Sequence, residues 1–334
     1  MSHATVAIPV RDGGELLART LGALAGQSVA HELLICDSGS RDGSVAMARA
    51  HGARVLEIEP QHFSHGATRN LLLREATGEH VALLTQDAEP ADERWLERLL
   101  GGFALAGDVA LVYGPYLPRP NASLGVRLEL ERWFRSLASD GRPRVDRLSD
   151  LERGATGGPA LAARALMGSR GFFSDANACI ARAAWELTPF REVPYAEDRV
   201  LAIDMLRAGH AKAYLPEAAV VHSHDYTATQ ELRRCFDEWR GLREVYGWRE
   251  PCSPGHLLRR LRGELGQARR ELVGEDAPRR TVALLAIALR QLMRLGGALL
   301  GGRADRLPAG VRRRLSLEGR DSFTPLALDE GVRS

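Results

Sequence analysis

The chain has 334 residues and a net charge of +2, from 45 basic and 43 acidic side chains. Hydrophobic residues make up 45% and charged residues 26% of it, which excludes global disorder and a collagenous or low-complexity protein. So small a net charge gives no general electrostatic reason to expect nucleic acid. At about 150 residues per domain, the length favours two domains or one large α/β domain with a tail.

Charge is unevenly distributed along the chain. The part from Pro251 onward carries 16 Arg against 9 Asp and Glu, so a basic tail follows a mildly acidic body. Four scattered cysteines show no CxxC spacing and no neighbouring histidine pair: Cys36, Cys179, Cys235 and Cys252. We therefore expect reduced thiols in a cytosolic compartment, without structural zinc or a disulfide framework.

Two segments bear on targeting and membranes. The first ten residues lack a basic start and a long apolar stretch, so we interpret them as a first strand rather than a signal peptide. Within residues 281–302 an apolar run is broken by Arg290, Gln291 and Arg294. Because a spanning helix needs about 20 mostly apolar residues, we predict that this segment does not cross a membrane.

Short apolar runs alternate with helical patterns through the first 118 residues. Strands are predicted at residues 5–10, 32–37, 54–59, 80–85 and 109–113, and helices at 15–25, 44–51, 67–76 and 92–105. This alternation is typical of βαβ units and a mostly parallel sheet with helices on both faces. The strands are continuous apolar runs, as expected when both sheet faces are covered.

The rest of the chain divides into an α/β part and a helical part. Residues 121–138 look helical, and the polar, Gly-rich residues 139–158 suggest a mobile loop. Further α/β elements are predicted at residues 178–180, 183–187, 199–208 and 219–222. Residues 231–314 are almost wholly helical and the last twenty look frayed. We expect an α/β catalytic domain over residues 1–230 and a helical extension with a frayed tail over residues 231–334.

Arginines alternate with leucines in the helical patterns at residues 256–272 and 279–300. Three arrangements fit this pattern: a basic amphipathic surface resting on anionic lipid, a helical cap packed on the α/β body, and a contact in a homo-oligomer.

Acidic residues follow three of the predicted strands, at Asp12, at Asp37 and Asp42, and at Asp87. In an open parallel sheet, ligands bind beyond the carboxyl ends of the strands. Each acid alone also fits a helix cap or a solvated loop. Their agreement with the topological rule favours a ligand site at this edge.

The sequence excludes two common phosphate-binding loops. No G-x-G-x-x-G follows the first strand, no G-x-x-x-x-G-K-[ST] occurs anywhere, and Lys212 is the only lysine. Phosphate must be held by other means. A divalent cation on Asp87 would serve, because hard cations prefer oxygen ligands and bridge carboxylate to diphosphate.

Four motifs occur in a fixed order: Ala7-Ile-Pro-Val10, Cys36-Asp-Ser-Gly-Ser-Arg-Asp-Gly43, Thr85-Gln-Asp-Ala-Glu-Pro90 and Ala196-Glu-Asp-Arg199. Together they resemble a family 2 glycosyltransferase of the GT-A fold, over residues 4–230. Three further motifs are similar to its rhamnosyltransferase branch: His65-Gly-Ala-Thr-Arg-Asn70, Gln86-Asp-Ala88 and His222-Ser-His-Asp225.

The resemblance implies a role for each matching residue. The donor nucleotide would be bound by Pro9, Arg11, Asp37, Asp42, Arg69 and Gln86. Mg²⁺ or Mn²⁺ would be held against the diphosphate by Asp87, His222 and His224. The chain departs from the family's D-x-D pattern at Thr85, which stands where the first Asp usually is. Asp198 matches the general base, with Glu197 beside it, and the acceptor side would include Asp175 and Asn177.

Simpler readings exist for several of these residues. Glu197 and Asp198 also fit a helix cap, and His222 a satisfied residue at a strand end. Arg69 fits either a phosphate contact at a helix start or a pair with an acid. The pattern around Asp175 and Asn177 suits a β-turn as well as an acceptor contact.

The implied reaction is inverting sugar transfer, with L-rhamnose from dTDP-rhamnose as the favoured donor. The acceptor would be a hydroxyl of a saccharide or lipid-linked molecule in cell-surface polysaccharide synthesis. The implied location is cytoplasmic, with peripheral contact at the inner membrane face and homo-oligomerisation left open. One alternative is a family 2 enzyme using another donor, such as a UDP-hexose. Another is a non-catalytic module that binds a sugar nucleotide or a glycan.

Overall fold

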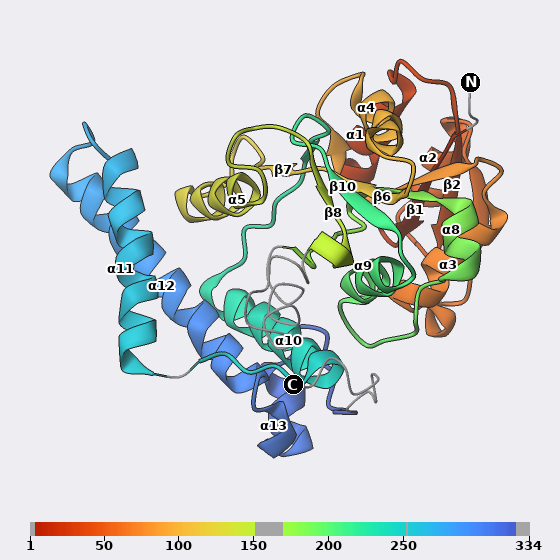
Figure 1. The fold of residues 1–334 in the computed structure, drawn as a ribbon. Coiled ribbons are helices and arrows are strands. Elements are labelled where there is room, and N and C mark those ends of the chain that lie inside the picture. Colours follow the sequence, from red (N-terminus) through yellow and green to blue (C-terminus); the bar gives the residue numbers. More distant parts are fainter. Residues whose placement is uncertain (1–3, 151–169, 252, 325–334) are drawn as a thin grey trace. The chain divides into compact units, whose positions relative to one another are not determined.

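The computed structural model describes residues 4–150, 170–251 and 253–324 (Figure 1). They form two compact units. Of the described residues, the first unit contains 4–119, 131–150, 170–192 and 197–223, and the second contains 120–130, 193–196, 224–251 and 253–324. Cys252, residues 151–158 of the predicted loop and the last ten residues of the predicted frayed tail lie outside the described residues. The described part of that predicted loop contains a short sheet strand at Arg144–Asp146 instead. Cys36, Cys179 and Cys235 are buried and unbridged.

The first unit is built on an eight-stranded sheet in the order β3-β2-β1-β4-β9-β6-β10-β8. Its strands are β1 (Ala4–Val10), β2 (His31–Asp37), β3 (Arg54–Glu57), β4 (His80–Leu84), β6 (Val109–Tyr113), β8 (Arg144–Asp146), β9 (Asn177–Ala181) and β10 (Ala211–Tyr214). A smaller sheet joins β5 (Glu89–Pro90), β11 (Val220–Val221) and β7 (Tyr116–Leu117) in the order β5-β11-β7.

The large sheet is mostly parallel, as the sequence predicts. Strands β1 to β4 pair in parallel, with Val10 opposite Asp37 at the ends of β1 and β2. Strand β9 enters antiparallel between β4 and β6. Consequently its first residues lie at the same edge as the last residues of β4.

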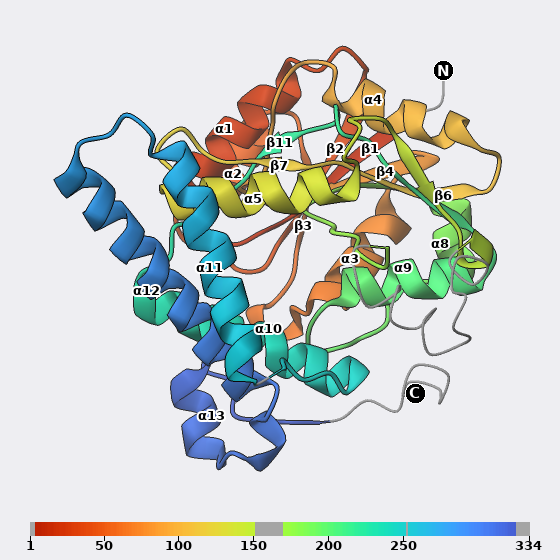
Figure 2. The same cartoon turned by 60° about the vertical axis from the view of Figure 1, so that its left-hand side comes forward.

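Helices cover both faces of this sheet (Figures 1 and 2). One face carries α1 (Gly14–Ala25), α2 (Ser44–Ala50) and α4 (Trp95–Gly101), whose apolar side chains share one core with strands β1, β4 and β6. In α1 the spacing of Leu17, Leu21 and Leu24 places all three on the sheet side. The other face carries α3 (His65–Glu75) and α9 (Glu197–Arg207). Short elements η1 (Pro60–His62), η2 (Gly102–Leu105) and α8 (Arg182–Leu187) complete the unit.

Lys212 lies in β10, which the sequence patterns did not predict. Its side chain is fully buried, and its ammonium lies 2.8 Å from the Asp146 carboxylate on the edge strand β8. Burial lowers the pKa of Lys212 to about 8, against the opposing attraction of Asp146. The ion pair therefore ties β8 to the sheet from within the protein.

The second unit is helical. It holds the first half of α5 (Leu124–Leu137), followed by α10 (Ala228–Tyr246), α11 (Pro254–Glu271), α12 (Ala277–Gly301), η3 (Ala304–Arg306) and α13 (Ala309–Leu315). A capping box between Thr227 and Gln230 starts α10. Glycines let α12 approach α10 closely, because a Cβ at Gly297 would meet the Leu232 carbonyl oxygen at 2.2 Å.

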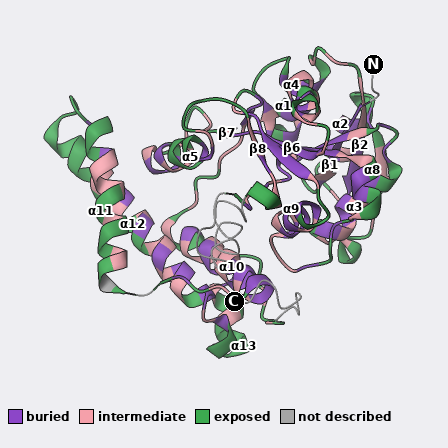
Figure 3. Cartoon of the chain, in the orientation of Figure 1, coloured by how far each residue is buried: buried purple, intermediate pink, exposed green. Residues whose placement is uncertain are grey.

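Helix α12 is long and apolar enough to cross a membrane by length and composition, with a mean hydropathy of 1.5 in its most apolar window. The sequence predicts that Arg290, Gln291 and Arg294 interrupt the apolar run. Over that window, however, the helix stays apolar despite these three residues. Within the unit, those charges are paired. Arg290 lies 2.5 Å from Glu129 of α5, and Arg294 lies 2.8 Å from Glu231 of α10. The buried positions of α12 begin at Ile287, and the ten residues before it are exposed or intermediate (Figure 3).

Candidate active site

The carboxyl ends of β1, β2 and β4 lie at one edge of the sheet. Hydrogen bonds from side chains connect the loops that follow these three strands. The backbone N–H of Arg11 donates to Gln86 Oε1 at 2.8 Å, and Gln86 Nε2 donates to the Arg11 carbonyl oxygen at 3.1 Å. Asp42 accepts from the backbone N–H of Gly14 and from Ser44. These bonds fix the loops after β1, β2 and β4 against each other.

Asp37, the last residue of β2, is 2% exposed at this edge. Its Oδ1 accepts from the backbone N–H groups of Gly39 and Ser40, both at 2.9 Å. Its Oδ2 is buried and has no hydrogen-bond partner among the described residues. Because an unsatisfied buried acceptor is costly, the free oxygen is suited to receive a donor group from a ligand.

Asp87 and His222 meet beyond the end of β4. Nδ1 of His222 lies 3.5 Å from Asp87 Oδ1, and Arg119 Nη2 lies 3.8 Å from Asp87 Oδ2. The buried hydroxyl of Thr85 has no hydrogen-bond partner within the part of the chain that the structure describes. The Asp87 carboxylate is a ligand of the kind that Mg²⁺ and Mn²⁺ prefer, and the imidazole of His222 lies beside it.

A second group of charges surrounds the start of α9. Arg69 of α3 is 3% exposed; its Nε lies 2.5 Å from Asp175 Oδ2, and its Nη1 lies 3.0 Å from Glu197 Oε1. Asp198 follows Glu197 and is half-buried. The preceding Ala196 has a φ of 58°, in the left-handed region that favours glycine, a strain that is typical of functional sites.

Arg69 thus lies among the carboxylates of Asp175, Glu197 and Asp198. Their burial and mutual repulsion shift the pKa values of two of these acids. Burial and the charge of Glu197 together raise the pKa of Asp198 to about 7, against the backbone hydrogen bond from Arg199 and the charge of Arg69, which both lower it. Burial and the neighbouring acids Asp198 and Glu197 also hold the pKa of Asp175 well above its usual range. Since like charges in one site cannot all ionise freely, this cluster holds a proton near neutral pH.

Tyr116 connects the two groups of charges. Its ring lies 5.0 Å from the His222 ring, between centroids, and its hydroxyl donates to Ser174 Oγ, next to Asp175. Tyr116 thus contacts His222 on one side and Ser174, the neighbour of Asp175, on the other, so it lies between the Asp87–His222 pair and the acidic cluster in the first unit.

Two site predictions need correction. Asn177 is fully buried, and its amide accepts from Trp95 Nε1 and donates to the carbonyl oxygens of Pro115 and Ala218. With its hydrogen bonds used inside the protein, it is a structural residue rather than an acceptor contact. Arg69 is bound to two acids in the interior, so it is an ion-pair partner and not a phosphate ligand.

Some of the remaining predicted residues are accessible at the sheet edge, and others form hydrogen bonds within the loops. Pro9 is half-buried and Arg11 is exposed at the end of β1. Asp42 and Gln86 use their polar atoms on the loops, which makes them supports of the site. His224 is the first residue of the second unit, two residues after His222.

Tyr116 and Arg119 are absent from the sequence prediction. Both follow β6, whose carboxyl end lies at the same edge as those of β1 and β4. Both follow the strand predicted at 109–113, so the rule that ligands bind beyond the carboxyl ends of parallel strands points to this segment as well.

Comparisons with known proteins agree with this geometry. The family model described as Glycosyl transferase family 2 matches residues 5–159. The O-antigen chain rhamnosyltransferase RfbN of Salmonella typhimurium is 32% identical over 238 residues, which cover 70% of this chain and 70% of that protein. The O-antigen chain rhamnosyltransferase WbaN of Salmonella anatum is 32% identical over 209 residues, 62% of this chain and 61% of that protein.

Solved structures share the fold at low sequence identity. The mannosyltransferase PcManGT from Pyrobaculum calidifontis, in complex with GDP-Man and Mn²⁺, has a TM-score of 0.54 and 16% identity, over 90% of this chain and 86% of that chain. S. aureus TarS 1-349 in complex with UDP-GlcNAc has a TM-score of 0.53 and 12% identity, over 94% of this chain and 78% of that chain. The chain therefore belongs to glycosyl transferase family 2 and is a glycosyltransferase of the GT-A fold.

Proposed function

We propose that this glycosyltransferase moves L-rhamnose from dTDP-rhamnose, with inversion, to a hydroxyl of a saccharide or lipid-linked acceptor. The reaction would serve cell-surface polysaccharide synthesis in the cytoplasm. Two relatives whose names specify rhamnosyl transfer to O-antigen chains support the donor sugar. The observation that supports the chemistry is the carboxyl group of Asp198, whose pKa is raised to about 7 by burial and by its neighbour Glu197.

Asp198 is the proposed general base. The acceptor oxygen attacks the anomeric carbon, its proton passes to the Asp198 carboxylate, and the bond from that carbon to the diphosphate oxygen breaks. A base works best when its pKa lies near the operating pH. Burial and Glu197 bring Asp198 to that range, whereas an exposed aspartate would be too weak a base.

Asp37 is the proposed receptor for the nucleobase or ribose of the donor, with Pro9 and Arg11 beside it. The unpaired Oδ2 of Asp37 supports this role, because a ribose hydroxyl or a base N–H would satisfy it. Arg119 is placed to contact the leaving diphosphate, since its guanidinium lies beside Asp87.

Asp87 and His222 would hold Mg²⁺ or Mn²⁺, with His224 as a third ligand on the same short segment. When bound, such a cation stabilises the charge on the leaving diphosphate as a Lewis acid. The Mn²⁺ in the PcManGT complex supports a divalent cation in this fold.

The donor assignment is tested by ligand binding. We expect dTDP-rhamnose with Mn²⁺ to raise the melting temperature of the protein more than UDP-glucose or GDP-mannose does. Asp37→Asn keeps an acceptor oxygen for the loop but loses the second carboxylate oxygen, so its Kd for the donor should rise about tenfold. Glu57→Gln, on the neighbouring strand β3, is the control. A larger rise in melting temperature with UDP-glucose would show that the donor is not dTDP-rhamnose. An unchanged donor Kd in Asp37→Asn would show that Asp37 does not bind the donor.

Metal dependence is a separate prediction. We expect Asp87→Asn and His222→Ala each to raise the Mn²⁺ concentration for half-maximal activity at least about tenfold, because each removes one ligand. Direct Mn²⁺ binding, followed by electron paramagnetic resonance, should weaken in parallel. Asp92→Asn, which alters a carboxylate paired with Arg98, controls for loss of charge. Equal Mn²⁺ affinity in all these proteins would contradict the proposed ligand set.

A further inference from the structure

Helix α12 exposes an apolar face. Val282 is 67%, Leu285 65%, Leu289 48% and Leu292 52% exposed. Their spacing of three, four and three residues places them on one side of the helix. We call these four residues the outer stripe.

The charged residues in the middle of α12 point the opposite way. Arg290 and Arg294 both pair with Glu129 of α5 and Glu231 of α10, at distances between 2.5 and 3.2 Å. A surface helix of a soluble protein normally turns its apolar side to the core and its charges to water. Here α12 keeps these charges inside and presents leucines outside, a pattern that marks an interaction surface.

Exposed arginines accompany the outer stripe in the helical hairpin of α11 and α12. Five of them form no ion pair with another described residue: Arg259, Arg262, Arg269, Arg270 and Arg280. Val273, in the turn between the two helices, is 81% exposed. The hairpin thus combines apolar side chains with unneutralised positive charge.

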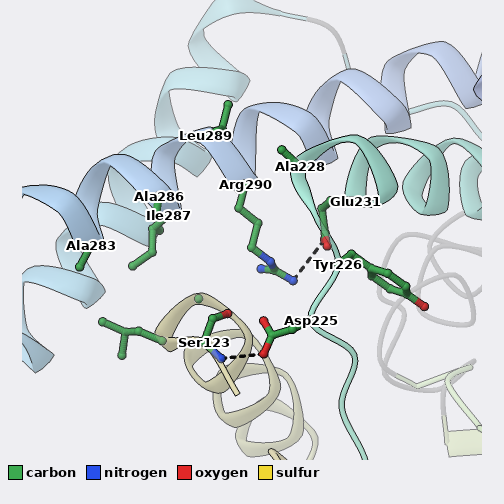
Figure 4. A pocket seen from close by; sticks show the side chains of 12 residues that line it. Ser123, Asp225, Tyr226, Ala228, Glu231, Ala283, Ala286, Ile287, Leu289 and Arg290 are labelled. Carbon is green, nitrogen blue, oxygen red and sulfur yellow. Dashed lines mark hydrogen bonds and ion pairs between the residues drawn. The ribbon is translucent and has the colours of Figure 1, made fainter. Parts of the chain in front are cut away.

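A pocket opens beside the outer stripe (Figure 4). It has a volume of about 370 Å³ and is lined largely by small and apolar residues, including Ala283, Ala286 and Ile287 of α12. Leu289 belongs to both the stripe and the pocket lining. Arg290 and Glu231 also line the pocket, so it lies on the inner, charged side of α12 and meets the outer stripe only at Leu289.

We propose that the α11–α12 hairpin rests on a bilayer of anionic phospholipid, with the outer stripe in the apolar layer and the arginines among the headgroups. Both components suit this partner, since interfacial helices combine buried apolar area with attraction to anionic lipid. A second copy of the chain suits it less, because two-fold pairing through the stripe would bring the same arginines together. The helix lies in the interface and does not span it, because Arg290 and Arg294 are held by acids of their own unit.

This inference names a membrane partner and does not depend on the donor or acceptor of the sugar transfer. It is tested with full-length protein and vesicles of phosphatidylcholine alone or of phosphatidylcholine mixed with anionic phosphatidylglycerol. The variants are Leu285→Glu/Leu289→Glu for the stripe and Arg269→Gln/Arg270→Gln/Arg280→Gln for the charges. Leu187→Glu, at an 81% exposed leucine of α8, is the matched control.

We expect wild-type protein and Leu187→Glu to float with the anionic vesicles and to be released by alkaline carbonate. The stripe variant should bind at least about tenfold more weakly, and the arginine variant should lose the preference for anionic over neutral lipid. Circular dichroism should show all variants equally helical.

Three results would overturn the proposal. The first is wild-type protein that ignores anionic vesicles, or a stripe variant that binds them as well as wild type. The second is retention after carbonate, which indicates a spanning helix. The third is a lipid-free dimer that the stripe variant converts to monomer, which assigns the stripe to a second copy.

Discussion

Replacing Asp198 by asparagine is expected to lower kcat about 10²- to 10⁴-fold, the usual contribution of a positioned general base. Asparagine has nearly the same shape but cannot take the proton of the acceptor hydroxyl. Donor binding should change little, because Asp37 and the Asp87–His222 pair are intact. Single-turnover transfer and donor titration would measure the two effects separately. Asp204→Asn, in the same helix and paired with Arg191 on the surface, should keep normal activity.

The pH profile gives a finer test of the same group. The carboxylate is the active form and its pKa is about 7, so kcat/KM should rise with pH up to about 7 and level off above it. Glu197→Gln removes a neighbouring negative charge, which lowers the pKa of Asp198 and moves the acid limb to lower pH. An acid limb that stays in place would show that another group sets it. Full activity in Asp198→Asn would end the assignment of the base.

Arg69→Met is expected to produce the largest loss of stability. Arg69 is 3% exposed and paired with Asp175 and Glu197. Removing one partner of a buried ion pair costs about 3–5 kcal/mol, because it leaves uncompensated charge in the interior. Urea unfolding would measure the change. Arg49→Met, at a surface arginine paired with Glu57, should have a small effect by comparison.

Partial rescue distinguishes lost pairing from lost packing. In Arg69→Met/Asp175→Asn one buried charge is removed together with its partner, so part of the stability should return. Arg69→Lys keeps the charge but cannot reach two carboxylates with one planar group, and it should lie between wild type and Arg69→Met. A double variant no more stable than Arg69→Met would show that packing, rather than charge, explains the loss.

Sequence patterns were sufficient to predict the strands that carry the proposed donor-binding residues. Strands β1, β2, β4 and β6 are continuous apolar runs between helical stretches, and this local signal led directly to Asp37 and Asp87. The position of β9 was beyond such reasoning. The sequence of a five-residue apolar strand does not indicate which strands it pairs with. In the fold, β9 pairs with β4 and β6, both of which lie far from it in the sequence.

The same limit explains the errors at Arg69 and Asn177. From sequence, Arg69 lies near the start of a helix and fits a phosphate contact, but its partners Asp175 and Glu197 are more than 100 residues away. From sequence, Asn177 fits an acceptor contact or a β-turn equally well, because it follows Ser174-Asp175-Ala176. In the fold it begins β9 and is enclosed by Trp95 and two carbonyl groups. Long-range partners decided both roles.

The burial of Lys212 has a consequence for regulation. It is the only lysine in the sequence, so among the described residues the folded protein offers no side-chain amine to an acetylating or ubiquitinating enzyme. Positive charge at its surface comes from guanidinium groups, which stay protonated at any physiological pH. Acidification or alkalinisation of the cell can therefore act on its carboxylates and histidines, while its cationic surfaces remain constant.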